Sequence, residues 1–491
     1  MNRREFLRIS TSTFVAGLIS GCSVQQGLFE SRPKSRRQPN IILFFSDDQG
    51  YNDLGCFGSE NVKTPHLDQL AAGGIRLTSF YVTSSVCTPS RSGLLTGRYP
   101  HRNGLFDLVR NNMTDYGHPY SELEYAVSPE GTQGLDEREI LMSQPLREAG
   151  YATGIFGKWD FGRAHQFLPL QRGFDTFYGF SNTGVDYFTH ERYEMPSMFR
   201  GNQRIKEEGY TTDLFKREAI KFIEANQDKP FFCYVPFNSP HGGSNLSRPG
   251  VQAPDEYIKL YGEPPGTKRQ RYWAAITCMD AAIGEILKKI NELGLENDTL
   301  VIFTCDNGWG ETKPLRGSKG SMYEGGIRVP FIARWPGTIP AGTKSDAFCS
   351  ALDLFPTFMS VANAKPLSKV KLDGYNILPV LTGRGKSKRR EHFWEIRGAR
   401  GARVGKWKWV LPTKRYIMPR DTTGELYDLA QDIGEKRNLA QERPDVLKMM
   451  QSKWDVWMQE MAETEPRGPF FKAYFDKLGY GDGSYRVQPV P

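Results

Sequence analysis

The sequence predicts an α/β fold: a large, mostly parallel or mixed central sheet sandwiched by helices, with a smaller C-terminal antiparallel α+β domain. Continuous apolar runs of strand length, such as "NIILFFS" at 40–46, are typical of strands buried on both faces. These runs alternate with helical patterns along residues 40–385, which indicates strand–helix–strand units. At 491 residues the chain is long enough for one large core and a smaller domain.

Helix signals separate the expected strands of the large domain. The stretch 64–74 begins with a threonine that could cap a helix, has proline in the first turn and ends in glycines. Residues 269–293 carry apolar side chains at three- and four-residue steps, which predicts a long amphipathic helix. A further helix is expected around 211–226. The expected strands are 40–46, 75–82, 151–157, 230–237, 298–305 and 328–335.

The pattern changes near residue 386. Short strands separated by turns are followed by a helix near 443–460, which predicts a smaller antiparallel α+β domain over 386–491. The aromatic and glycine-rich end of this domain is expected to pack as a loop. The expected strands are 392–396, 407–411 and 424–429.

The N-terminus has the features of a targeting segment. Its apolar run at 14–19 is too short to span a bilayer as a stable helix. "RREFL" is similar to a twin-arginine export signal, and "LISGC" to a bacterial lipobox in which Cys22 is lipidated; the alternative is an ordinary secretory signal with an incidental cysteine. We expect a signal peptide at 1–21, a linker at 22–39 and an exported periplasmic or outer-membrane-anchored lipoprotein that meets the membrane only through its N-terminal lipid.

Charge and cysteine content narrow the partners. The net charge of +8 favours anionic partners, although basic runs at 31–37 and 383–390 are also typical of solvated linkers and loops. No nucleic-acid-binding module is recognisable, so nucleic acid is not expected as a partner. The seven cysteines form no disulfide framework, and Cys233 and Cys305 lie in apolar strand-like runs that predict buried thiols.

Acidic and amide residues follow two of the expected strands. Asp47 and Asp48 come directly after the first strand, and Asp306 and Asn307 after the strand at 298–305. Carboxylates that converge at one sheet edge repel each other unless a cation lies between them. Oxygen ligands select Ca²⁺ or Mg²⁺ rather than zinc. The alternative is that each pair caps a turn.

Cys87 lies at an expected helix start in "CTPSRSGLLTG". Pro89 suits a first helical turn, so the free N–H groups of the helix N-terminus would lie beside the thiol, with Arg91 one turn further on. A thiol in that setting is expected to have a lowered pKa and could be a nucleophile. It could also be half of a disulfide or a buried apolar side chain, and a soft thiolate is an unnatural neighbour for a hard cation.

Three further cationic residues follow expected strands. Lys158, His241 and Lys319 are each, taken alone, most often solvated or structural residues. Beside a metal and a helix N-terminus, the three together predict a pocket for an oxyanion such as sulfate or phosphate.

The motif around Cys87 and several further stretches resemble those of a known enzyme family. "CTPSRSGLLTG" resembles the C-x-P-S-R-x-x-x-x-T-G signature of the type I sulfatases of the alkaline phosphatase superfamily. "NIILFFSDDQGYNDLG", "GIFGKWDFG", "LRGSKGSMYEGGIRVPFIARWPG" and "GELYDLAQDIGEKRNLA" are similar to further blocks of that family, in the family's order. The resemblance covers nearly the whole mature chain.

The resemblance implies a role for each matching position. A maturase in the producing cell would oxidise Cys87 to formylglycine, whose hydrated aldehyde is the nucleophile. One Ca²⁺ would be held by Asp47, Asp48, Asp306 and Asn307 together with a formylglycine oxygen at position 87. Arg91 would stabilise the hydrated aldehyde. Lys158, His241 and Lys319 would bind the sulfate, and His241 and Lys319 would assist departure of the sugar oxygen.

One position departs from the family pattern. The block that usually reads G-K-W-H reads "GKWD" here, which places Asp160 where a histidine takes a proton during regeneration of the aldehyde. A carboxylate can act as a base, but its charge disfavours anion binding beside it. We expect either that Asp160 is the base or that His165 or His101 reaches into the site; an impaired or non-catalytic relative is the alternative.

The sequence thus predicts an arylsulfatase-type sulfuric ester hydrolase acting on a sulfated oligo- or polysaccharide. Predicted export, basic charge and many aromatic residues favour a carrageenan-like or other marine galactan oligosaccharide. Two alternatives stay open: a phosphomonoester or phosphonate ester hydrolase of the same superfamily, and a sulfoglycan-binding protein without turnover.

Overall fold

A computed structural model describes residues 38–109, 121–245, 247, 250–365, 370–413 and 423–469. The predicted signal peptide, Cys22, nearly all of the linker and most of the aromatic C-terminal segment lie outside the described residues.

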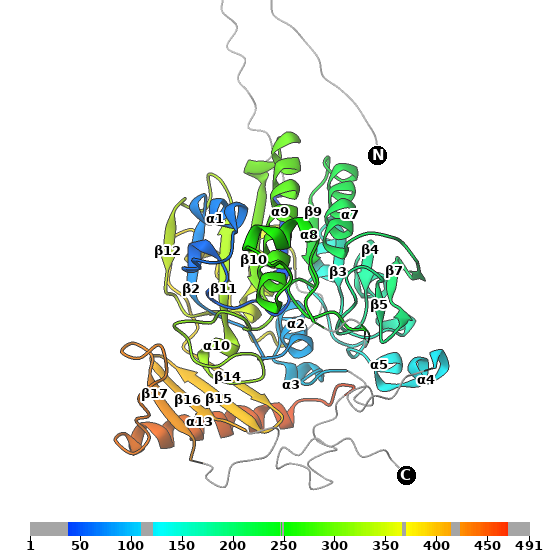
Figure 1. Ribbon diagram of the computed structural model, residues 1–491. Helices are drawn as coiled ribbons and strands as arrows, with labels where there is room; N and C mark the ends of the chain where they lie inside the picture. The colour runs from blue at the N-terminus through cyan, green and yellow to red at the C-terminus, as the bar shows by residue number, and fades with distance from the viewer. Residues whose placement is uncertain are drawn as a thin grey trace, which may run out of the picture. The chain divides into compact units, whose positions relative to one another are not determined.

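A mixed sheet forms the centre of the fold (Figure 1). In its middle, β1 (Asn40–Ser46) lies between β10 (Thr299–Cys305) and β9 (Phe231–Pro236) and runs parallel to both. Beyond β9, β3 (Ala152–Lys158) and β4 (Thr176–Phe180) continue parallel, whereas β11 (Arg328–Arg334) is antiparallel to β10. The remaining strands are β2 (Ile75–Tyr81), β7 (Met198–Arg200), β8 (Gln203–Arg204), β12 (Thr343–Ser345) and β13 (Cys349–Ser350). The fold prediction is confirmed, and all six strands expected in this sheet are present.

Helices cover both faces of the sheet. Successive side chains of β1 point to opposite faces, and every residue of β1 is buried because both faces are covered. One face packs against α2 (Cys87–Thr96), α6 (Ser143–Glu148) and α11 (Leu354–Ala362). The other packs against α1 (Pro65–Ala72), α7 (Thr211–Ala225) and α9 (Lys268–Glu292).

Shorter elements make up the loops around the sheet. The short helices are α3 (Pro100–Asn103), α4 (Glu122–Val127), α5 (Pro129–Thr132), α8 (Asp255–Ile258), α10 (Glu324–Ile327) and α12 (Leu378–Leu381). The 3₁₀ turns are η1 (Gly55–Phe57), η3 (His165–Phe167), η4 (Pro169–Arg172), η5 (Lys259–Tyr261), η6 (Glu296–Asp298) and η7 (Ala351–Asp353). A small hairpin pairs β5 (Glu191–Arg192) with β6 (Met195–Pro196).

The start of α1 differs from the prediction that its threonine caps the helix. Thr64 makes no side-chain cap; its hydroxyl accepts the Gly55 N–H at 2.9 Å. The carboxylate of Asp280 on α9 instead accepts the N–H groups of His66 and Leu67 at 3.1 and 2.8 Å. A tertiary carboxylate therefore satisfies the N–H groups that a local cap was expected to satisfy.

The C-terminal region forms the expected antiparallel sheet, in the order β14 (Glu391–Ile396), β15 (Ala399–Val404), β16 (Trp407–Leu411) and β17 (Glu425–Asp428). The helix α13 (Pro444–Glu463) packs against it (Figure 1). The sequence analysis missed β15, because its glycine- and arginine-rich sequence "ARGARV" shows neither the apolar alternation nor the β-branched content of a typical strand.

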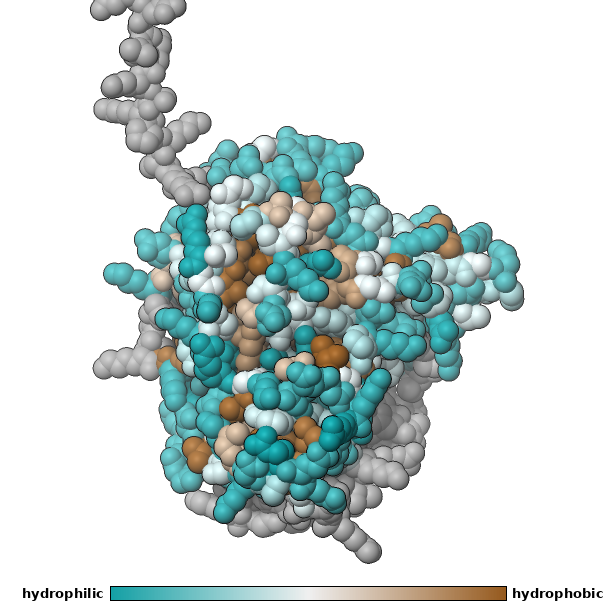
Figure 2. Space-filling view, turned by 90° about the vertical axis from the view of Figure 1, so that its left-hand side faces the viewer, coloured by the Kyte–Doolittle hydropathy of each residue, from teal (hydrophilic) through white to brown (hydrophobic). Residues whose placement is uncertain are grey.

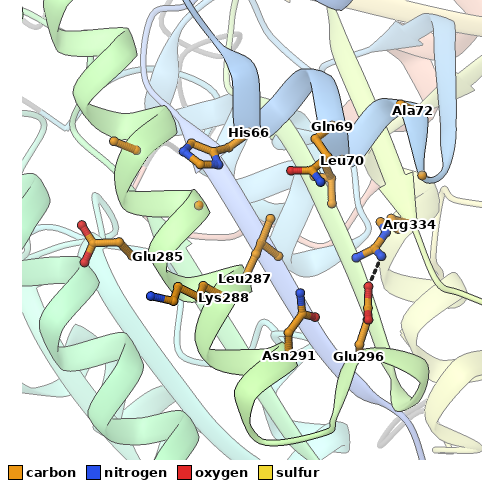
Figure 3. A pocket seen from close by; sticks show the side chains of 13 residues that line it. His66, Gln69, Leu70, Ala72, Glu285, Leu287, Lys288, Asn291, Glu296 and Arg334 are labelled. Atoms are coloured by element: carbon orange, nitrogen blue, oxygen red, sulfur yellow. Dashed lines mark hydrogen bonds and ion pairs between the residues drawn. The ribbon is translucent and has the colours of Figure 1, made fainter.

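Figure 2 shows one face as mostly hydrophilic with smaller hydrophobic patches. A cavity of about 730 Å³ lies between α1 and α9, lined among others by His66, Leu287 and Asn291 (Figure 3). The cavity is also lined by the ion pair of Glu296, which comes just before β10, and Arg334, the last residue of β11. The cavity therefore lies at the start of β10, at the opposite end of that strand from Asp306. Among the described helices, none has the length and apolar character needed to cross a bilayer.

Candidate active site

The four predicted metal ligands meet where β1 and β10 end. The two strands are parallel and paired to their last residues, so Asp47 and Asp306 follow at the same sheet edge. The Asp48 N–H donates to Asp306 Oδ1 at 3.0 Å, and Asn307 Nδ2 donates to Asp48 Oδ1 at 2.8 Å. The structure thus brings these four side chains into one cluster.

This cluster has the donor set of a hard cation site. Asp47 Oδ1 and Asn307 Oδ1 are buried and have no hydrogen-bond partner. Asp47, Asp48 and His241 each offer a ligand atom, and these atoms lie within 4.8 Å of one another. Burial raises the pKa of Asp47 well above its ordinary value, the sign of a carboxylate without enough positive charge around it. Buried carboxylate and amide oxygens without donors fit Ca²⁺ or Mg²⁺.

Cys87 is the first residue of α2, as the sequence predicted, and its side chain is 2% exposed. The expectation of a lowered thiol pKa is wrong: burial raises the pKa of Cys87 to about 11, and the charge of Lys158 does not offset this. The Gly320 N–H donates to Ser85 O at 2.9 Å and joins this segment to the loop of Lys319. The unmodified side chain of Cys87 is therefore a protonated thiol at neutral pH. It is one of six cysteines among the described residues, all of which are free thiols.

Three buried or partly buried cations pair with the carboxylates of the cluster, and Arg91 also lies 3.5 Å from Asp47 Oδ1. Lys158 Nζ lies 2.8 Å from Asp47 Oδ2, Lys319 Nζ lies 2.6 and 2.7 Å from the two Asp48 oxygens, and Arg91 donates to Asp306 Oδ2 from Nε at 3.1 Å and from Nη2 at 2.7 Å. Burial raises the pKa of Asp306, but Arg91 and Lys158 outweigh it and hold that pKa well below its usual range. Three carboxylates therefore face three cations, and Arg91 contacts the carboxylates of both Asp306 and Asp47.

His241 lies at the edge of the same cluster. Its Nε2 is 3.7 Å from Asp48 Oδ2, and its Nδ1 is 2.8 Å from Gly242 O, which assigns the proton to Nδ1. Burial lowers the pKa of His241 to about 3. The Tyr187 hydroxyl lies 2.8 Å from Asn238 O and 2.7 Å from His241 O and so holds this turn. Sequence reasoning missed Tyr187, which no motif marks.

Asp160 lies beside the cysteine. The Thr88 hydroxyl donates to Asp160 Oδ2 at 2.9 Å, and Lys158 Nζ is 3.8 Å from the same oxygen. Burial raises the pKa of Asp160. Its φ of 68° and that of Asp48, 63°, lie in the left-handed region that few non-glycine residues adopt. Thr88, adjacent to Cys87, was not singled out from the sequence.

Neither alternative histidine is placed at this position. His101 Nε2 lies 2.6 Å from Glu395 Oε2, and its ring stacks on Phe106 with centroids 5.1 Å apart. His165 is exposed, with Nε2 3.3 Å from Asn202 Nδ2. Neither histidine reaches into the site, because both rings are held by other partners. Asp160 is the residue that lies beside Cys87.

Comparisons with known proteins agree with this arrangement. A family model described as "Sulfatase" matches residues 39–364, and a second, "N-sulphoglucosamine sulphohydrolase, C-terminal", matches 318–461. The chain is 34% identical to arylsulfatase A of Homo sapiens over 477 residues, which covers 84% of this chain and 86% of that protein. It is 33% identical to N-acetylgalactosamine-6-sulfatase of Canis lupus familiaris over 368 residues, covering 70% and 66%.

Solved structures share the fold. The crystal structure of Ps i-CgsB aligns with a TM-score of 0.78 at 28% identity and covers 92% of this chain and 98% of that one. The complex of Ps i-CgsB with k-i-k-neocarrahexaose aligns with a TM-score of 0.77 at 29% identity and the same coverage.

Proposed function

Because the chain belongs to the sulfatase family and is a sulfuric ester hydrolase, we propose that it removes sulfate from a sulfated carbohydrate, using a formylglycine made from Cys87 and one Ca²⁺ ion. The observation that carries this proposal is the cluster of Asp47, Asp48, Asp306 and Asn307 facing two lysines beside Cys87.

Conversion of Cys87 fits the state of its thiol. A buried thiol with a raised pKa is a poor nucleophile at neutral pH. Formylglycine at this position would supply a hydrated aldehyde, whose hydroxyl groups would provide the nucleophile that the buried thiol does not. Mass spectrometry of the peptide that contains Cys87 tests this step. We expect the aldehyde in active preparations and a loss of about 10⁴-fold or more in kcat for Cys87→Ala; a fully active enzyme with an alkylatable thiol contradicts it.

Ca²⁺ fits the oxygen donors of the cluster. Asp47, Asp48, Asp306 and Asn307 would hold it, and the ion supplies Lewis acidity that lowers the pKa of a bound hydroxyl. Asp47 Oδ1 and Asn307 Oδ1 support this assignment, since both are buried oxygens without hydrogen-bond donors.

The cations around the cluster have the chemistry to bind sulfate. Lys158 and Lys319 contact the cluster and carry the charge for charge-assisted hydrogen bonds that stabilise the transition state, and the neutral ring of His241 lies beside Asp48. Lys319 would assist departure of the sugar oxygen, and His241 would join it once the charge of a bound sulfate raises its pKa and Nε2 is protonated. Arg91 orients Asp306 through two donated hydrogen bonds.

Asp160 would take the role of the usual histidine as the proton acceptor during regeneration of the aldehyde. Its carboxylate contacts the residue next to Cys87, and the Thr88 hydroxyl and Lys158 fix its position. A carboxylate near a sulfate is compatible with turnover because Lys158 lies within 3.8 Å of it and offsets its charge.

The proposed substrate is a carrageenan-like or other marine galactan oligosaccharide. The structure of Ps i-CgsB with k-i-k-neocarrahexaose supports this class, since that protein shares 29% identity over most of this chain. Sulfate release from a panel of sulfated galactan oligosaccharides, beside phosphate release from phosphate monoesters with Ca²⁺ held constant, tests it. Phosphate release exceeding sulfate release favours a phosphomonoester hydrolase; binding without release, in protein that contains formylglycine, favours a sulfoglycan-binding protein.

We also propose that the protein is an exported lipoprotein. The twin arginines and Cys22 of the N-terminal sequence support this. Cell fractionation of the native protein and of Cys22→Ala tests it: the native protein is expected in the membrane fraction and the variant in the soluble periplasm.

A further inference from the structure

Arg163 is a buried cation without a hydrogen-bond partner. It lies three residues after Asp160 and is only 7% exposed. Its Nε, Nη1 and Nη2 atoms are buried, and none of them has a hydrogen-bond or salt-bridge partner in the described part of the chain. Its one described close contact is the ring of Tyr125, whose centroid lies 4.2 Å from Cζ. A buried charge without compensation costs several kcal/mol, so such a residue needs an explanation.

The neighbouring carboxylate compensates Arg163 only in part: burial lowers the pKa of Arg163, and the charge of Glu130, which makes no salt bridge to it, does not offset this. Glu130 Oε1 accepts from Arg192 Nε at 2.8 Å, and Arg192 Nη1 donates to Ser244 Oγ at 3.0 Å. Arg192 and Glu130 therefore neutralise each other. Around Tyr125 this leaves one unmatched positive charge. Asn182 donates to the Tyr125 hydroxyl at 3.0 Å, and its own Oδ1 is a buried atom without a partner.

This cluster adjoins the candidate active site. Asn182 and Gly184 follow β4, the neighbour of the strand that ends in Lys158. A Cβ placed on Gly184 would lie 2.5 Å from Ser244 Oγ and 3.3 Å from His241 Cε1, so the serine that binds Arg192 and the proposed sulfate-binding histidine pack around one residue. The charge of Arg192 also lowers the pKa of Asp160, although burial raises it overall. The residues around Tyr125 are thus joined to the candidate active site through Arg192, Ser244 and Gly184.

We propose that Arg163 binds a second oxyanion of the saccharide, a sulfate or carboxylate substituent near the ester that is cleaved. This inference rests on the proposed function, because it makes Arg163 a specificity residue of the same site. The guanidinium presents N–H donors in a planar fork that matches an oxyanion. Its shielding from water strengthens that pairing, and Lys158, proposed to bind the sulfate, is buried as well, with 0% exposure.

A second buried arginine provides the matched control. Arg172 is 3% exposed and donates to three backbone carbonyls: to Leu135 O at 2.8 Å, to Asp136 O at 3.1 Å and to Glu139 O at 3.0 Å. Its partners are all supplied by the protein, so its role is structural. Replacing Arg172 leaves three carbonyls without their donor, whereas replacing Arg163 removes a charge that has no protein partner.

The test compares Arg163→Met with Arg172→Met in the full chain by thermal unfolding. The added ligands are inorganic sulfate and D-glucuronate. Neutral D-glucose and chloride at matched ionic strength are the controls. We expect Arg163→Met to keep or raise the Tm without ligand and to lose at least half of the rise in Tm caused by sulfate or glucuronate. Arg172→Met is expected to lower the Tm by several degrees and to keep that rise. Loss of the sulfate response alone indicates a second sulfate, and loss of the glucuronate response alone indicates a uronate.

A fall in Tm for Arg163→Met as large as that for Arg172→Met, or an unchanged response to both oxyanions, would overturn the proposal. Arg163→Lys keeps the charge and is expected to retain part of the response. Sulfate release by the wild type is measured separately. If the Arg163-dependent response occurs without sulfate release, the proposed reaction fails and the oxyanion site stands. If sulfate is released without that response, only the oxyanion site fails.

Discussion

Two buried charge clusters of this protein use the same residue types for different ends. The site cluster comprises Asp47, Asp48 and Asp306 with Arg91, Lys158 and Lys319. The interface cluster comprises Glu324 and Glu435 with Lys408 and Arg328, between α10 and the C-terminal sheet. In the site cluster, the buried atoms Asp47 Oδ1 and the adjacent Asn307 Oδ1 lack hydrogen-bond partners, whereas every buried side-chain nitrogen and oxygen of the interface cluster has one. Incomplete pairing at the site leaves capacity for ligands, and complete pairing at the interface serves structure.

The interface cluster still matters for the site. Lys408 Nζ on β16 lies 2.9 Å from Glu324 Oε1 and 3.3 Å from Glu435 Oε1, and Glu435 Oε2 accepts the Glu324 N–H at 2.8 Å. Arg316, three residues before Lys319, donates from Nη1 to the hydroxyl of Tyr427 on β17 at 2.7 Å. The C-terminal sheet therefore holds both ends of the segment that supplies Lys319.

The largest expected effect is on the interface. Lys408→Met leaves Glu324 and Glu435 buried with one cation fewer, and removing one partner of such a cluster costs about 3–5 kcal/mol. We expect a matching fall in the free energy of unfolding, measured by urea denaturation. The conservative control is Lys408→Arg. If Lys408→Met is as stable as the wild type, the view of this cluster as structural is wrong.

The next effect is on turnover. Asp160→Asn keeps the volume of the side chain but removes its basicity, and we expect kcat to fall by about 10²- to 10³-fold. Thr88→Val, which removes the hydroxyl that positions Asp160, is expected to cost about tenfold and to shift the pH profile of kcat. Steady-state sulfate release measures both. Unchanged turnover in Asp160→Asn would remove Asp160 from the reaction.

A third prediction concerns the unsatisfied oxygens of the site cluster. Ca²⁺ at 100 times its Kd is expected to stabilise the folded protein by about 2.7 kcal/mol, since it binds only the folded state. The Tm is therefore expected to rise with Ca²⁺ and fall with a chelator. Asp47→Asn should weaken this dependence, and Glu435→Gln, in the interface cluster, should not. Equal Ca²⁺ responses in the two variants would contradict the division between the clusters.

The smallest effect is a pH dependence of the interface. Burial raises the pKa of Glu435 to about 7, although Lys408 lowers it. The folded state then binds more protons than the unfolded state between pH 4.5 and 7, so stability falls as pH rises through this window. We expect stability to fall by up to about 1.4 kcal/mol per pH unit within this window, since the pKa of about 7 already includes the effect of Lys408. Glu435→Gln should flatten this part of the profile of Tm against pH, and a profile of unchanged slope would contradict the assignment.

Local patterns in the sequence were sufficient for most of the architecture. Strands such as β1 and β10 are apolar throughout because both of their faces are buried, and α9 shows the helical spacing of its buried side. The positions of Asp47 and Asp306 at one sheet edge follow from the parallel order of their strands. These signals lie in neighbouring residues, so a single sequence reveals them.

Other features depend on contacts between distant segments. The cap of α1 comes from Asp280, more than 200 residues away, and the raised pKa of Cys87 comes from burial rather than from its helix position. β15 is a strand because β14 and β16 pair with it on both sides.

The sequence by itself determined the α/β class, the oxygen-rich cluster, the place of Cys87 at a helix start and the departure at Asp160, because each is written in local spacing and residue type. Only the tertiary structure decided that Asp160, and neither His101 nor His165, lies beside Cys87, and that Arg163 is buried without a partner. Those facts depend on which side chains share one low-dielectric space. Burial and pairing are properties of the packed chain, and no single segment encodes them.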